Sequence, residues 1–199
     1  AVTTTADLAP LLARATAVAI GPGLGQDPWG RELLTPVLAS GKPLVLDADA
    51  LNWLARHPLR REDWVLTPHP GEAARLLGCT PAEVQADRFS AARRLRDEFG
   101  GTLILKGAGT LVMGAGRRPP GICSQGNPGM ASGGSGDVLT GMVAAFLARG
   151  LAAEDAAEVA VCLHAAAGDA AARAGEQGML ASDRTAAIRP TLNQVGAQP

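Results

Sequence analysis

The chain has 199 residues, of which 47% are hydrophobic, and its formal net charge is −1. These values are typical of a globular protein whose length suits one domain with a sizeable core. The balanced charge offers no basic face for a polyanion, and no apolar run approaches the roughly 18 residues of a membrane span, so neither nucleic acid nor membrane partners are expected. The three cysteines (Cys79, Cys123 and Cys162) are widely spaced, and the N-terminus has no signal-peptide arrangement. We therefore expect a cytoplasmic protein with reduced thiols and without a zinc site or disulfide framework.

Short apolar runs bounded by glycine, proline and aspartate alternate with segments of helical spacing. The runs predict strands at 17–20, 44–46, 64–66, 102–105 and 110–113. A spacing of three or four residues predicts helices at 7–14 (capped by Asp7), 29–39, 51–54, 72–77, 81–99, 137–149 and 152–172. This alternation predicts a single α/β domain over 1–199, with three layers and a mainly parallel sheet covered by helices on both faces. The polar residues 190–199, which include two prolines, predict a loosely ordered tail.

Five polar or glycine-rich segments fall where predicted strands end or helices begin. They are 21–25, 47–49, 67–72, 106–110 and 127–137. Ligands of an open parallel sheet bind at the carboxyl ends of its strands, so we expect these segments to converge on one site.

The segment that ends at Asp137 has the clearest chemical meaning. Gly133, Gly134 and Gly136 leave backbone N–H groups unshielded at the start of a helix, where the helix dipole also attracts phosphate. In that setting Asp137 can accept a proton from a substrate hydroxyl while the amides stabilise a phosphoryl group. The alternative is an ordinary first-turn acid that favours the helix dipole, but the three glycines favour a functional role. Neither a P-loop nor a dinucleotide fingerprint is present, so phosphate must be held in another way.

Two further segments carry candidate ligand contacts. The glycines at 107–109 allow a nucleotide to approach the backbone, with Lys106 or Thr110 placed for phosphate or ribose, although an ordinary hairpin explains them equally well. His69 lies between two prolines that restrict the backbone. Glu72 is either a helix-capping acid or a residue that holds Mg²⁺ through water, and the capping role is slightly favoured.

Weaker signals surround these segments. The glycines of 21–25 form a turn that substrate could approach. One of Asp47 and Asp49 is expected to cap the helix that follows, while a metal role has no support. His164 is expected to be a packed or surface residue of its helix.

Taken in chain order, the motifs closely resemble the ADP/ATP-dependent NAD(P)H-hydrate dehydratases, a ribokinase-like family. The motifs are Gly21-Pro-Gly-Leu-Gly25, Asp47-Ala-Asp-Ala-Leu51, Thr67-Pro-His-Pro-Gly-Glu72, Lys106-Gly-Ala-Gly-Thr110 and Asn127-Pro-Gly-Met-Ala-Ser-Gly-Gly-Ser-Gly-Asp137. They span most of the chain, and the last is the most diagnostic.

The resemblance implies a hydro-lyase that returns the S-epimer of hydrated NADH or NADPH (NADHX or NADPHX) to NAD(P)H. The expected co-substrate is ADP or ATP with Mg²⁺, and the reaction passes through a phosphorylated intermediate that eliminates phosphate. The resemblance makes Asp137 the catalytic residue and places Gly23, His69 and Asp137 against the hydrate. It assigns the nucleotide to Lys106, Gly107, Ala108, Gly109, Thr110, Gly134 and Gly136.

Family members begin with additional βα units before the region that matches Ala1. We therefore expect this chain to be N-terminally incomplete, because it starts at a helix before a middle strand. We also expect a homo-oligomer, in particular a tetramer, and an upstream epimerase domain in the full gene product is consistent with some relatives. Two other functions remain open. One is a ribokinase-like vitamin-precursor kinase that keeps its phosphorylated product, and the other is a nucleotide-binding module without turnover.

Overall fold

A single six-stranded sheet forms the centre of the molecule, in a computed structural model that describes residues 2–116 and 118–195. The strands lie in the order β1-β2-β3-β4-β5-β6, so each strand pairs with its neighbour in sequence. Their bounds are β1 Val18–Ile20, β2 Leu44–Leu46, β3 Trp64–Leu66, β4 Thr102–Leu105, β5 Thr110–Met113 and β6 Gly121–Cys123. The first four strands are parallel, whereas β4-β5 and β5-β6 pair antiparallel. The mainly parallel sheet is thus confirmed.

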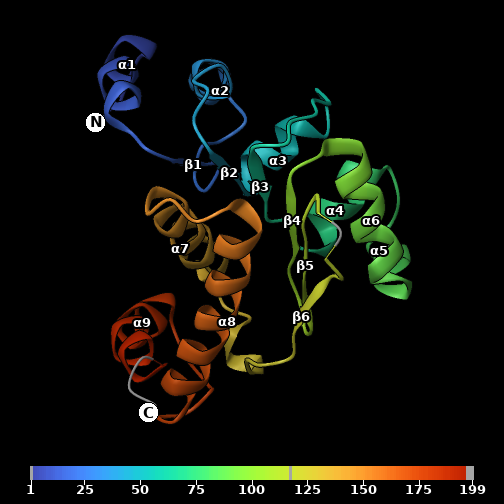
Figure 1. The fold of residues 1–199 in the computed structure, drawn as a ribbon, viewed down its shortest axis with the longest axis vertical. Helices are drawn as coiled ribbons and strands as arrows, with labels where there is room; N and C mark the ends of the chain where they lie inside the picture. The colour runs from blue at the N-terminus through green and yellow to red at the C-terminus, as the bar shows by residue number, and fades with distance from the viewer. Residues whose placement is uncertain (1, 117, 196–199) are drawn as a thin grey trace.

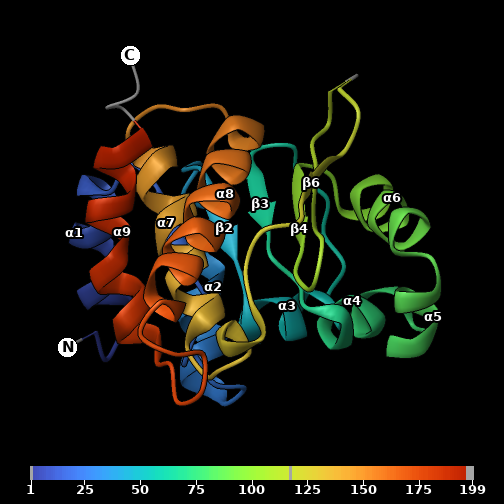
Figure 2. The same cartoon turned by 90° about the horizontal axis from the view of Figure 1, so that it is seen from below.

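Helices cover both faces of this sheet (Figures 1 and 2). Their bounds are α1 Thr5–Arg14, α2 Pro28–Leu38, α3 Ala48–Leu54, α4 Pro70–Leu77, α5 Pro81–Ala86, α6 Arg88–Phe99, α7 Ser135–Ala148, α8 Ala153–Ala172 and α9 Ala181–Val195, with a 3₁₀ turn η1 at Pro128–Met130. Figure 1 shows α7 and α8 on one side of the sheet and α4, α5 and α6 on the other. The expected three layers are confirmed.

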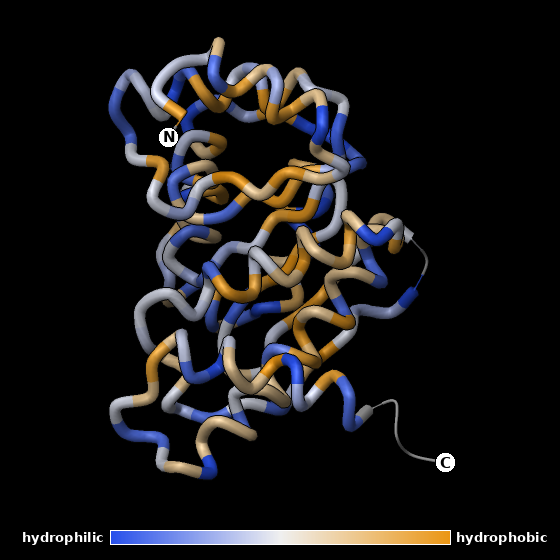
Figure 3. Tube along the Cα trace, turned by 90° about the vertical axis from the view of Figure 1, so that its left-hand side faces the viewer, coloured by the Kyte–Doolittle hydropathy of each residue, from blue (hydrophilic) through white to orange (hydrophobic). Residues whose placement is uncertain are grey.

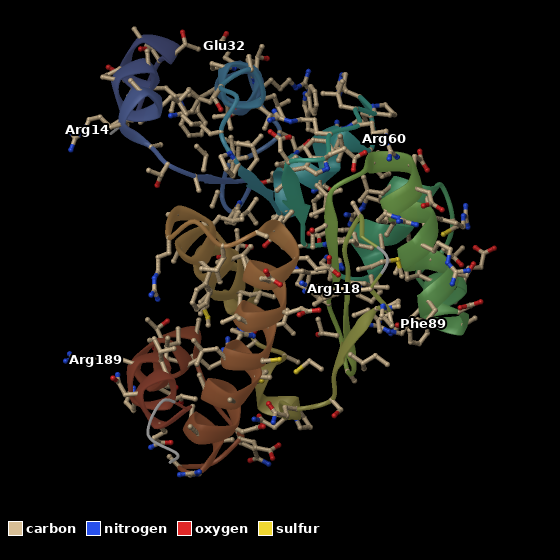
Figure 4. The ribbon with its side chains drawn as sticks, in the orientation of Figure 1. Arg14, Glu32, Arg60, Phe89, Arg118 and Arg189 are labelled. Carbon is tan, nitrogen blue, oxygen red and sulfur yellow. The ribbon has the colours of Figure 1, made fainter. Side chains whose placement is uncertain are left out.

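The two faces form separate cores because alternate residues of a strand point to opposite sides. Leu44, Leu46 and Trp64 pack with α2–α6, whereas Val45 and Val65 pack with α7 and α8. All five side chains have no exposed surface. The most hydrophobic parts of the trace accordingly run through the interior (Figure 3). Charged side chains such as Arg14 and Arg189 extend outward at the periphery (Figure 4).

The region from 81 to 99 forms two helices, so the prediction of one continuous helix is wrong. Asp87 has φ −144° and ψ 83°, which interrupts the helical backbone. Its carboxylate accepts a hydrogen bond from the Ser90 N–H and caps α6. The expected cap at Asp7 is also wrong, because Thr4 caps α1 and Asp7 occupies the third helical position of a capping box.

Helix α9 was not expected, and it includes part of the segment predicted to be a loose tail. Residues 190–195 continue α9 through Pro190, and Thr191 is buried, so the prediction is wrong for these residues. Positions 196–199 lie outside the described residues. The helix packs mainly against α8, where burial of one face outweighs the hydrogen bond that Pro190 cannot donate. None of the helices in the described ranges is long and apolar enough to cross a membrane.

Candidate active site

A cavity of about 890 Å³ opens beside the carboxyl ends of β2, β3 and β4. Four of the five predicted segments contribute to its lining, together with β6 and α8. The lining residues are Asp47, Ala48, His69, Pro70, Glu72, 106–110, 123–128, Met130, Ala131, Ser132, 135–137, Leu139, Val161, His164 and Ala165. The expectation that the strand-end loops meet at one site is therefore confirmed for these four segments.

An ion pair between Asp47 and Lys106 lies at one wall of this cavity. The Lys106 Nζ donates to Asp47 Oδ1 over 2.7 Å, and the Thr140 hydroxyl donates to Asp47 Oδ2, also over 2.7 Å. Asp47 is only 1% exposed. Burial raises the pKa of Asp47, but the charge of Lys106 and hydrogen bonds from Lys106, Thr140 and Thr67 outweigh burial, so the pKa lies below its usual value. Asp47 is thus an ionised anchor that positions the lysine ammonium.

The backbone around Asp47 is unusually constrained. Gly21 has φ +128°, and a Cβ at this position would lie 1.7 Å from the Asp47 carbonyl oxygen. Ala48 has φ 47°, a left-handed conformation that residues other than glycine adopt at a cost of about 1–3 kcal/mol. Asp47 precedes α3 without a side-chain capping bond, and Asp49 binds the Gly25 N–H instead. Neither aspartate caps α3, so that prediction is wrong.

His69 and Glu72 form a capping box at the start of α4. The His69 Nδ1 accepts from the Gly71 and Glu72 N–H groups, while Glu72 Oε2 accepts from the His69 N–H over 2.8 Å. Because Nδ1 is an acceptor, the neutral imidazole carries its proton on Nε2. Glu72 is 6% exposed, and its Oε2 lies 3.8 Å from Lys106 Nζ. The favoured reading of Glu72 as a capping acid is confirmed.

The described residues contain no group of three or more His, Cys, Asp or Glu side chains that could hold a metal ion. Glu72 is occupied by its capping bond and lies beside a lysine ammonium, which repels a divalent cation. A metal role for Glu72 remains a prediction that this geometry does not favour.

The N-terminus of α7 opens into the cavity without a capping side chain. The N-cap residue is Gly134, with φ 81°, and as a glycine it has no side chain that could cap the helix. The Ser135 N–H donates to the Ser132 carbonyl oxygen, whereas those of Gly136 and Asp137 have no acceptor within 2–116 and 118–195. Asp137 is exposed and lines the cavity next to these amides. This arrangement combines an anion-binding helix end with an adjacent carboxylate.

Gly136 also makes room for the lysine. A Cβ on Gly136 would lie 3.1 Å from Lys106 Nζ and 3.5 Å from Asp47 Oδ2. The ammonium therefore reaches the start of α7, where positive charge and free amides lie together. This cluster would stabilise a phosphoryl group during its transfer.

Arg88 holds the turn that follows Lys106. Its Nη2 donates to the carbonyl oxygens of Leu105, Lys106 and Gly109 over 3.0–3.3 Å. The Thr110 hydroxyl closes the same turn by donating to the Gly107 carbonyl oxygen over 2.9 Å. The flexible glycine turn is thus given one defined shape by an arginine from α6.

Two predicted contact residues do not line the cavity. Gly23 is exposed, and a Cβ there would meet nothing within 4 Å. Gly134 adjoins the lining residue Ser135, but a Cβ placed on Gly134 would lie 3.1 Å from the Cβ of Ala181. The roles of both glycines therefore remain predictions.

Sequence reasoning gave no individual role to Arg88, Ser132 or Arg184. It placed Asp47 in a segment of the site but gave it no role beyond a possible helix cap. His164 is packed, as expected, with 8% of its surface exposed, and it also lines the cavity. Burial and then the charge of Arg184 lower the pKa of His164 to about 4, so the imidazole is neutral at pH 7. The sequence signal for His164 was its position among the apolar residues of α8, and that position does not indicate that the residue lines a cavity.

Comparisons with known proteins show the family of this chain. A family model described as NAD(P)H-hydrate dehydratase matches residues 2–190. The chain is 50% identical over 188 residues to a bifunctional NAD(P)H-hydrate repair enzyme of Coxiella burnetii, covering 94% of this chain and 38% of that protein. It is 40% identical over 186 residues to an ADP-dependent (S)-NAD(P)H-hydrate dehydratase of Neisseria meningitidis, covering 88% and 62% respectively. The chain thus spans little more than a third of the bifunctional relative and less than two thirds of the shorter one.

Solved structures share the fold. A ribokinase-like superfamily protein of Enterococcus faecalis superposes with a TM-score of 0.84 at 32% identity, covering 98% of this chain and 68% of that one. An ADP/ATP-dependent NAD(P)H-hydrate dehydratase of Bacillus subtilis, co-crystallised with ATP and Mg²⁺, gives a TM-score of 0.79 at 28% identity, covering 92% and 68%. The fold is ribokinase-like, and the chain belongs to the NAD(P)H-hydrate dehydratase family.

Proposed function

We propose that this chain carries out the dehydration of the S-epimer of NADHX or NADPHX, with ADP or ATP as co-substrate. The observation that carries the proposal is the uncapped start of α7, where the N–H groups of Gly136 and Asp137 and the Lys106 ammonium lie beside the Asp137 carboxylate at one cavity. The Neisseria relative is named for this reaction with ADP, which supports the same substrate class here.

In the proposed mechanism, the Asp137 carboxylate accepts the proton of the hydroxyl on the hydrated nicotinamide ring. The hydroxyl oxygen forms a bond to the terminal phosphorus, and the bond from that phosphorus to the nucleotide leaving group breaks. The free amides at α7 and the Lys106 ammonium stabilise the negative charge on the phosphoryl oxygens. The phosphorylated ring then loses phosphate together with a ring proton, which restores the double bond of NAD(P)H.

The nucleotide would lie against the turn from Lys106 to Thr110, which Arg88 holds in shape. Lys106, Gly107, Ala108, Gly109, Thr110 and Gly136 line the cavity and would contact it, with Gly134 close to its phosphates. His69 lines the cavity and would present Nε2–H to the hydrate. Gly23 would reach the same substrate from the neighbouring loop.

Mg²⁺ would enter with the nucleotide, held by phosphate oxygens and water, since the side chains at this site offer it no cluster of ligands. When bound, it would neutralise phosphate charge. A water-mediated contact with Glu72 remains part of the proposal.

The proposal also covers the oligomeric state, the cellular location and a second activity in a longer protein. β1 pairs with β2 alone among the described residues, and Ala19 on β1 is exposed, which supports a homo-oligomer or a covering segment at this edge. Light scattering would distinguish a monomer from the proposed oligomer. The free thiols of all three cysteines support a cytoplasmic location. Relatives named as bifunctional support an epimerase as the second activity of a longer protein.

The decisive experiment supplies NADHX with ADP or with ATP and follows the recovery of NADH absorbance. Asp137→Asn should lower turnover by about a hundredfold or more, because the proton acceptor is lost, while ADP binding persists. Asp97→Asn is the matched control, since Asp97 is exposed on α6 and does not line the cavity. Accumulation of a stable phosphorylated vitamin precursor would point to the kinase instead. Nucleotide binding without any turnover would show that the protein is a nucleotide-binding module and not an enzyme.

A further inference from the structure

Arg184 on α9 is a fully buried cation close to the glycine-rich loop. It has no exposed surface, and its Nη1 donates to the Ser132 hydroxyl oxygen over 3.2 Å. Its Nε and Nη2 have no hydrogen-bond partner in the described part of the chain. The adjacent Asp183 is exposed and accepts the Leu180 N–H at the start of α9. The buried guanidinium therefore forms no ion pair with a carboxylate of 2–116 or 118–195.

A buried guanidinium without an anionic partner is unfavourable, because burial removes its hydration. Its surroundings compensate the charge only in part, because burial lowers the pKa of Arg184 below its usual value and outweighs the exposed Asp183 carboxylate, whose charge raises that pKa. His164 is neutral, and its pKa is lowered first by burial and then by the positive charge of Arg184. The fold thus maintains a buried positive charge that has no ion pair within the described residues, next to the cavity-lining Ser132.

Ser132 connects this charge to the cavity. Its hydroxyl oxygen accepts from Arg184, so its hydrogen is available to donate elsewhere. Ser132 lines the cavity, and its carbonyl oxygen fixes the Ser135 N–H at the start of α7. A hydroxyl polarised by a guanidinium therefore lies in the same wall as the free amides of Gly136 and Asp137.

We propose that Ser132 donates its hydroxyl hydrogen to a phosphoryl oxygen of the bound ligand and that Arg184 is a positioning residue that acts through Ser132. The proposal rests on the proposed function in requiring a phosphorylated ligand in this cavity. The ligand's phosphoryl group adds negative charge next to the Ser132 hydroxyl, which connects it to an Arg184 without an ion pair in the described part of the chain. The phosphoryl oxygen belongs either to the adenine mononucleotide or to the pyrophosphate of the dinucleotide substrate.

Calorimetry with ADP, AMP and NADH tests Ser132→Ala in the purified protein. A hydrogen bond to a charged oxygen predicts affinity about 10- to 100-fold weaker for the ligand that makes it. A loss of affinity for ADP but not for NADH assigns the contact to the mononucleotide. A loss of affinity for NADH but not for ADP assigns it to the dinucleotide. No loss of affinity for any of the three ligands overturns the proposal. An equal loss for all three, which share the adenosine phosphate, supports a contact with that phosphate when adenosine, which has no phosphoryl group, binds the variant and the wild type equally. An equal loss for adenosine overturns the proposal.

Arg184→Met tests the positioning role, with Arg189→Met as its control on the exposed face of the same helix (Figure 4). Arg184→Met should weaken the binding of the same ligand that Ser132→Ala affects. The double variant should bind that ligand no more weakly than either single variant does. Removal of a buried charge that has no ion pair among the described residues should leave the thermal midpoint of the ligand-free protein unchanged or higher. A lower midpoint with equal losses for all ligands would show a purely structural arginine and refute the positioning role.

These measurements do not depend on turnover. A wild-type protein that binds ADP but does not convert NADHX would disprove the proposed function and leave the Ser132 contact open to the same binding test. Conversely, full activity of Ser132→Ala with unchanged affinities would refute this inference alone.

Discussion

Replacement of Lys106 by methionine would leave the buried Asp47 carboxylate without its cation. Lys106 Nζ lies 2.7 Å from Asp47 Oδ1, and the two side chains are 18% and 2% exposed. Methionine keeps most of the side-chain volume but removes the charge and the donors. The Thr140 hydroxyl would remain as a hydrogen-bond donor to the carboxylate.

Loss of one partner of a buried ion pair costs about 3–5 kcal/mol. For a domain of this size, each kcal/mol lowers the thermal midpoint by about 2–4 °C, so Lys106→Met should unfold about 6–20 °C below the wild type. The double variant Asp47→Asn/Lys106→Met should recover part of this loss, since the amide carries no charge.

The pH dependence of the loss follows from the pKa of Asp47. In the wild type this pKa lies below its usual value of 3.8, so the stabilisation is complete above pH 3.8 and is lost as the pH falls through the lower folded value. Without Lys106, burial is opposed only by the hydrogen bonds from Thr140 and Thr67, so the pKa of Asp47 rises relative to the wild type. The stability deficit of Lys106→Met should therefore be largest near pH 7 and should shrink as the pH falls through the pKa of Asp47 in the variant and the carboxyl is protonated.

Circular dichroism during thermal and urea unfolding, at several pH values, measures this effect. Lys42→Met is the matched control, because Lys42 is the one other lysine in the sequence and forms no ion pair within the described residues. A loss below 1 kcal/mol, or one no larger than that of Lys42→Met, would refute the view that Lys106 compensates a buried charge.

Gly136→Ala should cost about 1–3 kcal/mol in urea unfolding, since its Cβ would lie 3.1 Å from the Lys106 ammonium, whereas Gly133→Ala, with nothing within 4 Å, should cost less. His69→Asn should keep the cap of α4 and change stability by less than about 1 kcal/mol, while the KM for the hydrate rises about tenfold through loss of the imidazole. An unchanged KM would remove His69 from the substrate site. Arg88→Met should weaken ADP binding about tenfold in calorimetry by releasing the turn after Lys106, and Arg88→Lys should recover little because a lysine lacks the planar fork.

The interior of the fold was predictable because its strands are continuous apolar runs bounded by turn residues. Strands β2, β3, β4 and β5 have the predicted bounds, and β1 differs by one residue. Strand β6 escaped prediction since it has three residues, one of them glycine, and its Ile122 is 60% exposed. Helix α9 escaped because its buried side chains include Arg184 and Thr191, which do not form an apolar stripe.

The site was predictable to the extent that topology alone determines it. Loops after parallel strands meet at one edge, so their glycines and polar residues could be placed together without knowledge of any contact. The Asp47–Lys106 pair joins residues 59 positions apart, and the Ser132–Arg184 pair joins residues 52 positions apart. Each contact depends on packing between helices and strands, which local sequence patterns do not encode.

The order of the strands has a consequence for how the protein is synthesised. Each strand pairs with the one before it, so the sheet can extend at one edge as the ribosome releases the chain. The hydrogen bond from Thr140 to Asp47 spans 93 residues and closes only after α7 has docked. The described strands can therefore pair before α7 docks, and the cavity wall formed by Gly136 and Asp137 takes its place beside Asp47 only afterwards.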